Sequence, residues 1–152
     1  VNSFINKNVQ AAQVFFKSGL KIAYLDQFYN IIEKEKTILD NVLDDATDIQ
    51  LARKVLSLYG FPDTYIVNQK VNNLSGGEMC RLALAKISVS PLDFIILDEP
   101  TNNIDIETKE ILLSSLKKFK GAILIITHDK KFASDINCER VVEIKDREMK
   151  NI

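Results

Sequence analysis

Hydrophobic residues in the second half of the chain gather into two short runs separated by a segment with helical spacing. Residues 94–97 and 122–127 form these runs, which are typical of parallel strands buried on both faces. The segment between them is expected to form a helix that Asp105 caps and Gly121 ends. Its apolar stripe consists of Leu112, Leu116 and Phe119. Strand, helix and strand in this order predict a right-handed βαβ unit with two parallel strands in one sheet.

The first half of the chain changes from a strand pattern to a helical pattern. Alternating apolar and polar residues predict strands over residues 14–16 and 20–25. Further on, Thr37 and Asp48 precede segments with helical spacing and are candidate N-caps. Residues 61–73 show no clear period and are expected to be a connection. The pattern also predicts a helix over residues 130–136 and final strands over residues 140–144 and 148–152.

A glycine-rich turn opens the next predicted helix, which covers residues 75–88. Ser75-Gly76-Gly77-Glu78 fits the S-x-x-E pattern of a capping box, in which the Ser and Glu side chains each accept a hydrogen bond from the other's backbone amide. One interpretation is a helix cap and nothing more. Two consecutive glycines, however, have a high cost in conformational entropy if only a cap is needed. Backbone amides without side-chain cover at the positive end of a helix attract anions. The segment therefore favours an anion site.

Two carboxylates follow the first apolar run. Asp98 and Glu99 are consecutive, so their side chains point to opposite faces of the strand. Phosphoryl transfer needs a hard cation on the phosphate oxygens and a group that orients or deprotonates the attacking water. We therefore expect Asp98 to face Mg²⁺ and Glu99 to act as the base. The alternative is a solvated acidic strand end.

The single histidine of the chain, His128, follows the second apolar run. Parallel strands end at the same sheet edge, where ligands bind in such folds, so His128 is expected beside Asp98 and Glu99. There it can donate to a γ-phosphate oxygen or position Glu99. Capping or packing is the alternative role for an isolated histidine. Gln27 ends a predicted strand and is a candidate metal or water contact, its alternative being an ordinary exposed residue.

Composition and charge exclude several classes of protein. The 152 residues are 46% hydrophobic and 27% charged, as in one soluble globular domain. A net charge of −1 gives no basic footprint for nucleic acid. The apolar runs are far shorter than the roughly 20 residues of a membrane helix. Cys80 and Cys138 show neither metal-ligand spacing nor a disulfide framework, so a buried Cys80 thiol and a cytoplasmic location are expected.

The usual phosphate-cradling loop, G-x-x-x-x-G-K-S/T, does not occur in the sequence, which contains no Gly-Lys dipeptide. An anion-binding turn and an acid pair without this loop indicate part of an ATP-driven machine rather than a complete enzyme.

Five segments resemble, in order, the motifs of ABC ATPases. Residues 74–78 resemble their signature motif and residues 94–100 their Walker B strand. Residues 102–105 resemble the D-loop, residues 127–129 the switch histidine, and residues 22–27 the strand that ends in the Q-loop glutamine. The resemblance covers the chain from about residue 22 to about residue 145. It implies an α/β fold, a P-loop NTPase-like (RecA-like) and mostly parallel sheet core with an inserted α-helical subdomain.

Within that family the chain looks like the ABC-F group. The features are Glu78 at the end of the signature, the D-loop segment over residues 101–105, and residues 128–132 after the second strand. The group consists of soluble twin-ATPase proteins without membrane domains that act on ribosomes, some of which confer antibiotic resistance. The third D-loop position, usually His in that group, is Asn103 here.

The resemblance implies ATP binding and Mg²⁺-dependent hydrolysis shared between two ABC ATPase domains, with the ribosome as a partner of the full-length protein and no membrane span. ATP on the Walker A loop of one domain would be covered by Ser75 and Gly77 of the other. Hydrolysis would use Glu99 and His128, with Asp98 and Gln27 at the metal. The implied ATP-contacting residues are Gln27, Ser75, Gly76, Gly77, Glu78, Asp98 and Asp105.

The resemblance also implies domain boundaries. Residues 1–27 would be a partial β segment of the ATPase core ending at the Q-loop, residues 28–88 the α-helical signature subdomain, and residues 89–152 the α/β core. The Walker A segment is expected immediately before Val1, so the chain alone is expected to be inactive. The alternatives are the nucleotide-binding subunit of an ABC transporter, a chromosome-maintenance or repair ATPase head, and a non-catalytic module that supplies only the signature face. The sequence leaves open whether the role is translation or drug resistance, and which half of a twin protein this is.

Overall fold

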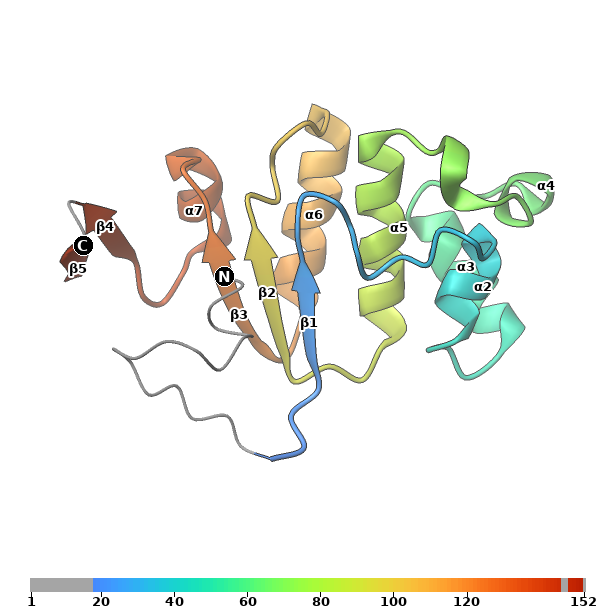
Figure 1. Ribbon diagram of the computed structural model, residues 1–152, viewed down its shortest axis with the longest axis horizontal. Coiled ribbons are helices and arrows are strands. Elements are labelled where there is room, and N and C mark those ends of the chain that lie inside the picture. Colours follow the sequence, from blue (N-terminus) through green and yellow to red (C-terminus); the bar gives the residue numbers. More distant parts are fainter. Residues whose placement is uncertain (1–17, 146–147, 152) are drawn as a thin grey trace.

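A computed structural model describes residues 18–145 and 148–151 of the chain (Figure 1). Its main sheet has three parallel strands in the order β1-β2-β3, namely β1 (Ile22–Leu25), β2 (Phe94–Asp98) and β3 (Ala122–Ile126). Leu25 lies opposite Leu97 in the register of β1 with β2, and Asp98 lies opposite Ile126 in that of β2 with β3. The predicted parallel α/β fold is confirmed.

Helices fill the long connection between β1 and β2. They are α2 (Ile38–Leu43), α3 (Ile49–Leu58), α4 (Thr64–Val67), the 3-10 helix η1 (Val71–Asn73) and α5 (Gly76–Val89). Figure 1 shows α5 beside the sheet and α2, α3 and α4 beyond it, on the side away from β3. Helix α5 therefore lies between the sheet and helices α2, α3 and α4.

The remaining elements follow β2. Helix α6 (Ile106–Lys118) joins β2 to β3, and α7 (Lys130–Ile136) follows β3. Strands β4 (Val142–Lys145) and β5 (Glu148–Asn151) form a separate antiparallel pair. The predicted helix over residues 130–136 and the final strand pair are confirmed.

The predicted N-caps are present. Thr37 accepts from the Asp40 amide, Asp48 from the Leu51 amide, and Asp105 from the Thr108 amide. Ser75 and Glu78 form the reciprocal capping box. A cap of this kind contributes about 1 kcal/mol to helix stability, so these four caps fix where the helices start.

The core lies between one face of the sheet and the helices. On that face, Ala23, Leu25, Ile95 and Leu97 are all buried. They meet a layer from α5 and α6 that includes Leu82, Ala83, Leu112 and Leu116. Cys80 is fully buried in the same core, as expected. This packing fixes the direction of β2 and therefore the place where its acidic end emerges.

Two expectations are wrong, and a third lies outside the described residues. Strand β3 is not buried on both faces: Ala122 is exposed and Leu124 is 37% exposed, because β3 pairs only with β2 within the described residues. Residues 61–73 are not a plain connection, since they contain α4 and η1, which are too short to show a period. The strand expected over residues 14–16 lies outside the described part of the chain.

Gly121 does not end α6 as a left-handed glycine. Phe119 is the C-cap and has extended backbone angles. A Cβ on Gly121 would instead lie 2.7 Å from the Phe119 ring and 2.8 Å from the Asp93 carbonyl carbon, with the Asp93 carbonyl oxygen closer still. Glycine is needed here because the chain passes against the backbone that precedes β2.

Gly121→Ala is therefore expected to lower the free energy of unfolding by about 1–3 kcal/mol, the usual cost of overpacking. Urea denaturation measures this. Gly76→Ala is a matched control, because its Cβ would meet only the Asn103 carbonyl oxygen, at 3.5 Å. Equal stability of the two variants would show that the close approach at Gly121 is not as tight as described.

Candidate functional site

The candidate site lies where β2 and β3 leave the sheet. Asp98 is the last residue of β2 and lies opposite Ile126, the last residue of β3. The Glu99 amide then donates to the Ile126 carbonyl at 2.8 Å. Figure 1 shows the arrowheads of β2 and β3 side by side, at the same end of the molecule where α5 begins. The residues after both strands therefore share one edge.

Glu99 and His128 contact each other at this edge. His128 Nδ1 lies 2.9 Å from Glu99 Oε2, and the side chains are 78% and 28% exposed respectively. Glu99 has a φ of +50°, in the left-handed region that non-glycine residues rarely adopt. Such a conformation costs of order 1–3 kcal/mol and is found mostly at functional sites. Here it directs the carboxylate out of the strand and toward the histidine.

The contact between Glu99 and His128 depends on a proton. The Glu99 Oε2 atom is buried and, among the described residues, has no conventional hydrogen-bond donor. When both ring nitrogens of His128 carry protons, His128 and Glu99 form an ion pair; the neutral ring can donate to that oxygen only in the tautomer with its proton on Nδ1. The hydrogen bond and then the charge of Glu99 raise the pKa of His128 above its ordinary value of 6.5. This contact therefore stabilises the fold fully below pH 6.5, and the contribution is lost as the pH rises through the raised pKa.

The proton dependence gives a prediction for this chain, which has one histidine. In an NMR titration the ring protons of His128 are expected to shift with a midpoint above about 6.5, because the Glu99 carboxylate favours the protonated ring. Glu99→Gln is expected to lower the midpoint toward the ordinary value. Glu107→Gln, in the first turn of α6, is the control and should leave it unchanged. An unperturbed midpoint in the parent chain would contradict the contact.

Helices α6 and α7 hold the loop that carries His128. Asp129 caps α7 by accepting from the Phe132 amide at 2.9 Å, and its other carboxylate oxygen accepts from Lys109 Nζ at 2.6 Å. Lys109 lies over the Phe132 ring, 5.7 Å from its centre, and Phe132 is fully buried. The Lys109 ammonium holds the pKa of Asp129 below its usual range. The sequence gives no local signal for Lys109, because its contact with Asp129 joins residues 20 positions apart.

Asp98 also has a partner that the sequence did not indicate. Its Oδ2 atom accepts a hydrogen bond of 2.9 Å from the hydroxyl of Tyr24, on β1. Burial, and then this hydrogen bond, raises the pKa of Tyr24 to about 12. The Tyr24 hydroxyl is therefore a donor to Asp98 throughout the ordinary pH range.

Gln27 lies in the turn after β1 and is exposed. Asp26 builds this turn by accepting from the backbone amides of Phe28 and Asn30. Among the described residues, no hydrogen bond joins Gln27 to Asp98. The structure thus places Gln27 after the carboxyl end of β1 and, within the part of the chain that it describes, forms no hydrogen bond from Gln27 to Asp98 or Glu99.

The glycine-rich turn forms a second group, at the start of α5. The Ser75 amide and hydroxyl both donate to Glu78 Oε2, at 2.8 and 2.7 Å, and these bonds hold the pKa of Glu78 below its usual range. Gly76 is exposed, whereas Gly77 is buried against α6. A Cβ on Gly77 would lie 3.1 Å from Asp105 Oδ2, so the structure brings Gly77 and Asp105 together.

The glycine-rich turn and the pair formed by Glu99 and His128 are separate groups. No hydrogen bond or ion pair among the described residues joins residues 75–78 to Glu99 or His128. Arg81 of α5 instead donates to the Thr108 hydroxyl of α6 at 2.8 Å, which ties the signature helix to the D-loop helix.

The carboxylates present fit a magnesium ion only as part of a larger set of ligands. The described residues contain no group of three or more His, Cys, Asp or Glu side chains that could hold a metal. Mg²⁺ commonly uses one or two carboxylates together with water and substrate phosphate oxygens. Asp98, at the end of β2 and with one oxygen held by Tyr24, fits that role.

The parallel sheet, with an acid pair and a histidine at its carboxyl edge and a capped glycine turn on a neighbouring helix, has the fold of a nucleotide-binding cassette domain. Comparison with known proteins agrees: the family model described as "ABC transporter" matches residues 5–102. The chain belongs to this family. Within it, the chain is an ATP-binding domain of the ABC-F type.

Curated relatives support the assignment to the ABC-F type. The chain is 40% identical over 131 residues to "ATP-binding protein Uup" of Buchnera aphidicola subsp. Schizaphis graminum, covering 83% of this chain and 22% of that protein. It is 36% identical over 114 residues to "ABC transporter F family member 2" of Arabidopsis thaliana, covering 74% of this chain and 16% of that protein. The chain thus spans about a fifth of the length of the curated relatives it matches.

Solved structures support the fold. The structure of "the ATP-binding cassette MJ0796 bound to ADP and Pi", in a dimeric post-hydrolysis state, superposes with a TM-score of 0.68 at 27% identity, covering 87% of this chain and 63% of that chain. Within the described residues, every helix is too short or too polar to cross a lipid bilayer.

Proposed function

We propose that the chain supplies the hydrolytic residues of one ATP site and the signature face of another, in an ABC-F type protein that acts on the ribosome. The contact between Glu99 and His128, beside Asp98 at the end of β2, supports the hydrolytic part most directly. Glu99 has strained backbone angles, and its carboxylate lies next to a histidine at the carboxyl edge of a parallel sheet. This arrangement is suited to phosphoryl transfer to water.

The hydrolytic residues have separate roles in this proposal. Glu99 orients the attacking water and accepts its proton as the bond between the water oxygen and the γ-phosphorus forms. His128 donates to a γ-phosphate oxygen and keeps Glu99 in place while the bond to the ADP oxygen breaks. Asp98 and Gln27 lie on the metal side. Mg²⁺, when bound, neutralises charge on the β- and γ-phosphate oxygens.

The signature face acts on the ATP of a second ABC domain. Ser75, Gly76 and Gly77 form the cap and first turn of α5, where backbone amides lack helix partners and the helix end is positive. Glu78 holds this cap in place, and Asp105 supports Gly77 from the D-loop. The neighbouring structures include dimers of cassettes, which supports a second domain as the partner.

The proposed subdomains follow the order of elements. Residues 28–88 contain α2 to most of α5 and form the helical signature subdomain, whereas residues 1–27 and 89–152 belong to the core. Because the sequence contains no G-x-x-x-x-G-K-S/T loop, we propose that this chain alone does not hydrolyse ATP. A cytoplasmic location follows from the proposed ribosomal partner.

The ribosomal role is tested in the full-length protein with Glu99→Gln. Trapping the ATP-bound state is expected to make the variant sediment with ribosomes in ATP but not in ADP. Glu107→Gln serves as the control, because its side chain lies in the exposed first turn of α6. A variant that binds ATP and remains free of ribosomes would overturn the ribosomal role while leaving the ATPase role intact.

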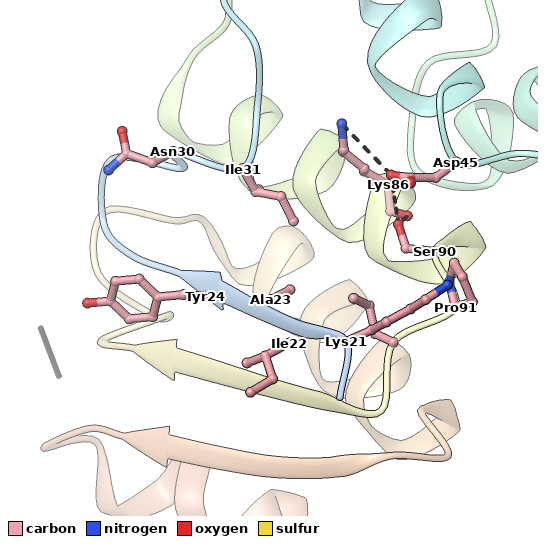
Figure 2. A pocket seen from close by; sticks show the side chains of 11 residues that line it. Lys21, Ile22, Ala23, Tyr24, Asn30, Ile31, Asp45, Lys86, Ser90 and Pro91 are labelled. Carbon is pink, nitrogen blue, oxygen red and sulfur yellow. Dashed lines mark hydrogen bonds and ion pairs between the residues drawn. The ribbon is translucent and has the colours of Figure 1, made fainter. Parts of the chain in front are cut away.

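One observation favours a second candidate, the nucleotide-binding subunit of a transporter. An open groove of about 580 Å³ lies beside the edge of β1, between the sheet and the helices (Figure 2). Its lining includes Asn30 and Ile31 of the turn after Gln27, and Lys86, Asp45 and Ser90 on its far wall. A groove next to the Q-loop turn suits a helix from a membrane partner. Recovery of the full-length protein with membranes rather than ribosomes would support this candidate.

A further inference from the structure

We propose that Tyr24 is a positioning residue that holds the Asp98 carboxylate in the orientation needed for magnesium. This inference rests on the proposed function, in which Asp98 is the magnesium-side acid. The observation behind it is the hydrogen bond of 2.9 Å from the Tyr24 hydroxyl to Asp98 Oδ2.

The strand register explains why these two side chains meet. Tyr24 lies opposite Ile96 in the pairing of β1 with β2. Asp98 is two residues further along β2 and therefore on the same face of the sheet. Diagonal neighbours of this kind are about 7–8 Å apart at the backbone, within reach of an aromatic side chain. Figure 2 shows the Tyr24 ring leaning toward the carboxyl ends of the strands, with its hydroxyl directed away from the groove.

The two residues of this hydrogen bond occupy different places in their strands. Ala23 and Leu25, on either side of Tyr24, are 6% and 2% exposed and pack into the core, so β1 holds Tyr24 at a fixed height. Asp98 instead ends its strand and is followed by Glu99 in a strained turn. A carboxylate at such a junction gains orientation from a donor on the neighbouring strand.

The hydrogen bond from Tyr24 gives the two Asp98 oxygens different roles. The tyrosine hydroxyl occupies Oδ2, which leaves Oδ1 for a cation or for a water of its hydration shell. A neutral donor orients the carboxylate without placing a positive charge where the metal must bind. Removing partners of this kind typically weakens metal binding by about 10–100-fold.

A purely structural role for Tyr24 predicts a different result. Phe retains the aromatic ring and removes only the hydroxyl. Tyr24→Phe therefore separates the hydrogen bond to Asp98 from side-chain packing. Tyr65→Phe is the matched control, because Tyr65 lies on α4 and is 75% exposed.

The test uses the full-length protein and Mn²⁺ as a spectroscopic probe. Mn²⁺ binding is measured by electron paramagnetic resonance in the presence of a non-hydrolysable ATP analogue. Tyr24→Phe is expected to raise the Mn²⁺ dissociation constant at least about 10-fold, with analogue affinity in EDTA unchanged. The Mg²⁺ concentration for half-maximal ATPase activity should rise by a similar factor, whereas kcat at saturating Mg²⁺ stays near the parent value. Tyr65→Phe should change none of these quantities.

Asp98→Asn in the same Mn²⁺ assay separates the two ways of failing. If Asp98→Asn weakens Mn²⁺ binding and Tyr24→Phe does not, the positioning role of Tyr24 is overturned and the proposed function stands. If Asp98→Asn leaves Mn²⁺ binding unchanged, the metal role of Asp98 in the proposed function fails, and the role of Tyr24 fails with it. Equal loss of metal-free and metal-dependent nucleotide binding in Tyr24→Phe would show a structural role and also overturn the inference.

Discussion

Replacement of Glu99 by glutamine is expected to lower kcat for ATP hydrolysis in the full-length protein by about 10²–10⁴-fold, the usual contribution of a general base. The amide keeps the shape of the side chain but cannot accept a proton from water. ATP binding is expected to persist, because Asp98, His128 and the signature residues are unchanged. Single-turnover measurement of phosphate release separates the chemical step from product release.

Two further variants make this result specific to Glu99. Glu107→Gln removes the same charge from the exposed first turn of α6 and should leave kcat unchanged. His128→Ala removes the partner of Glu99 and should also slow the chemical step, since its ring lies 2.9 Å from the carboxylate. If Glu99→Gln kept kcat within a factor of about three of the parent, a base role worth 10²-fold or more would be excluded.

Phe132→Ala is expected to lower the free energy of unfolding by about 3–5 kcal/mol, the usual cost of deleting a buried phenylalanine. Phe132 is 0% exposed and is the buried anchor of α7. Because domains are stable by only about 5–15 kcal/mol, this is a large share of the total. Urea denaturation followed by circular dichroism measures the change.

The substitution of Phe132 should also disturb the sheet edge that carries His128. Lys109 contacts both the Phe132 ring and the Asp129 carboxylate beside His128. Phe28→Ala is the matched control: Phe28 is 63% exposed, and its truncation should change stability by less than about 0.5 kcal/mol. Equal effects of the two substitutions would show that α7 does not depend on this anchor.

Features with local signals were predictable from the sequence. Thr37, Asp48 and Asp105 were recognised as caps because a cap bonds an amide two or three residues away. The edge shared by residues 98–99 and 128 was predictable because consecutive parallel strands end on the same side. The caps depend on short segments, and the shared edge depends on a general rule of chain topology.

Features that depend on distant contacts were not predictable. The pairing of Tyr24 with Asp98 joins residues 74 positions apart and follows from the register of β1 with β2, which no local pattern encodes. The positive φ of Glu99 has no sequence signal, since the residue is not glycine. The exposure of β3 depends on which strands flank it, so a run of apolar residues alone overstated its burial.

The most direct test of the hydrolytic site is a structure of the full-length Glu99→Gln variant with ATP and Mg²⁺. We expect a γ-phosphate within hydrogen-bonding distance of His128 and position 99, with Asp98 on the metal side, and Ser75 against the nucleotide of the second ABC domain. A γ-phosphate bound away from this sheet edge, with His128 facing only solvent, would contradict it.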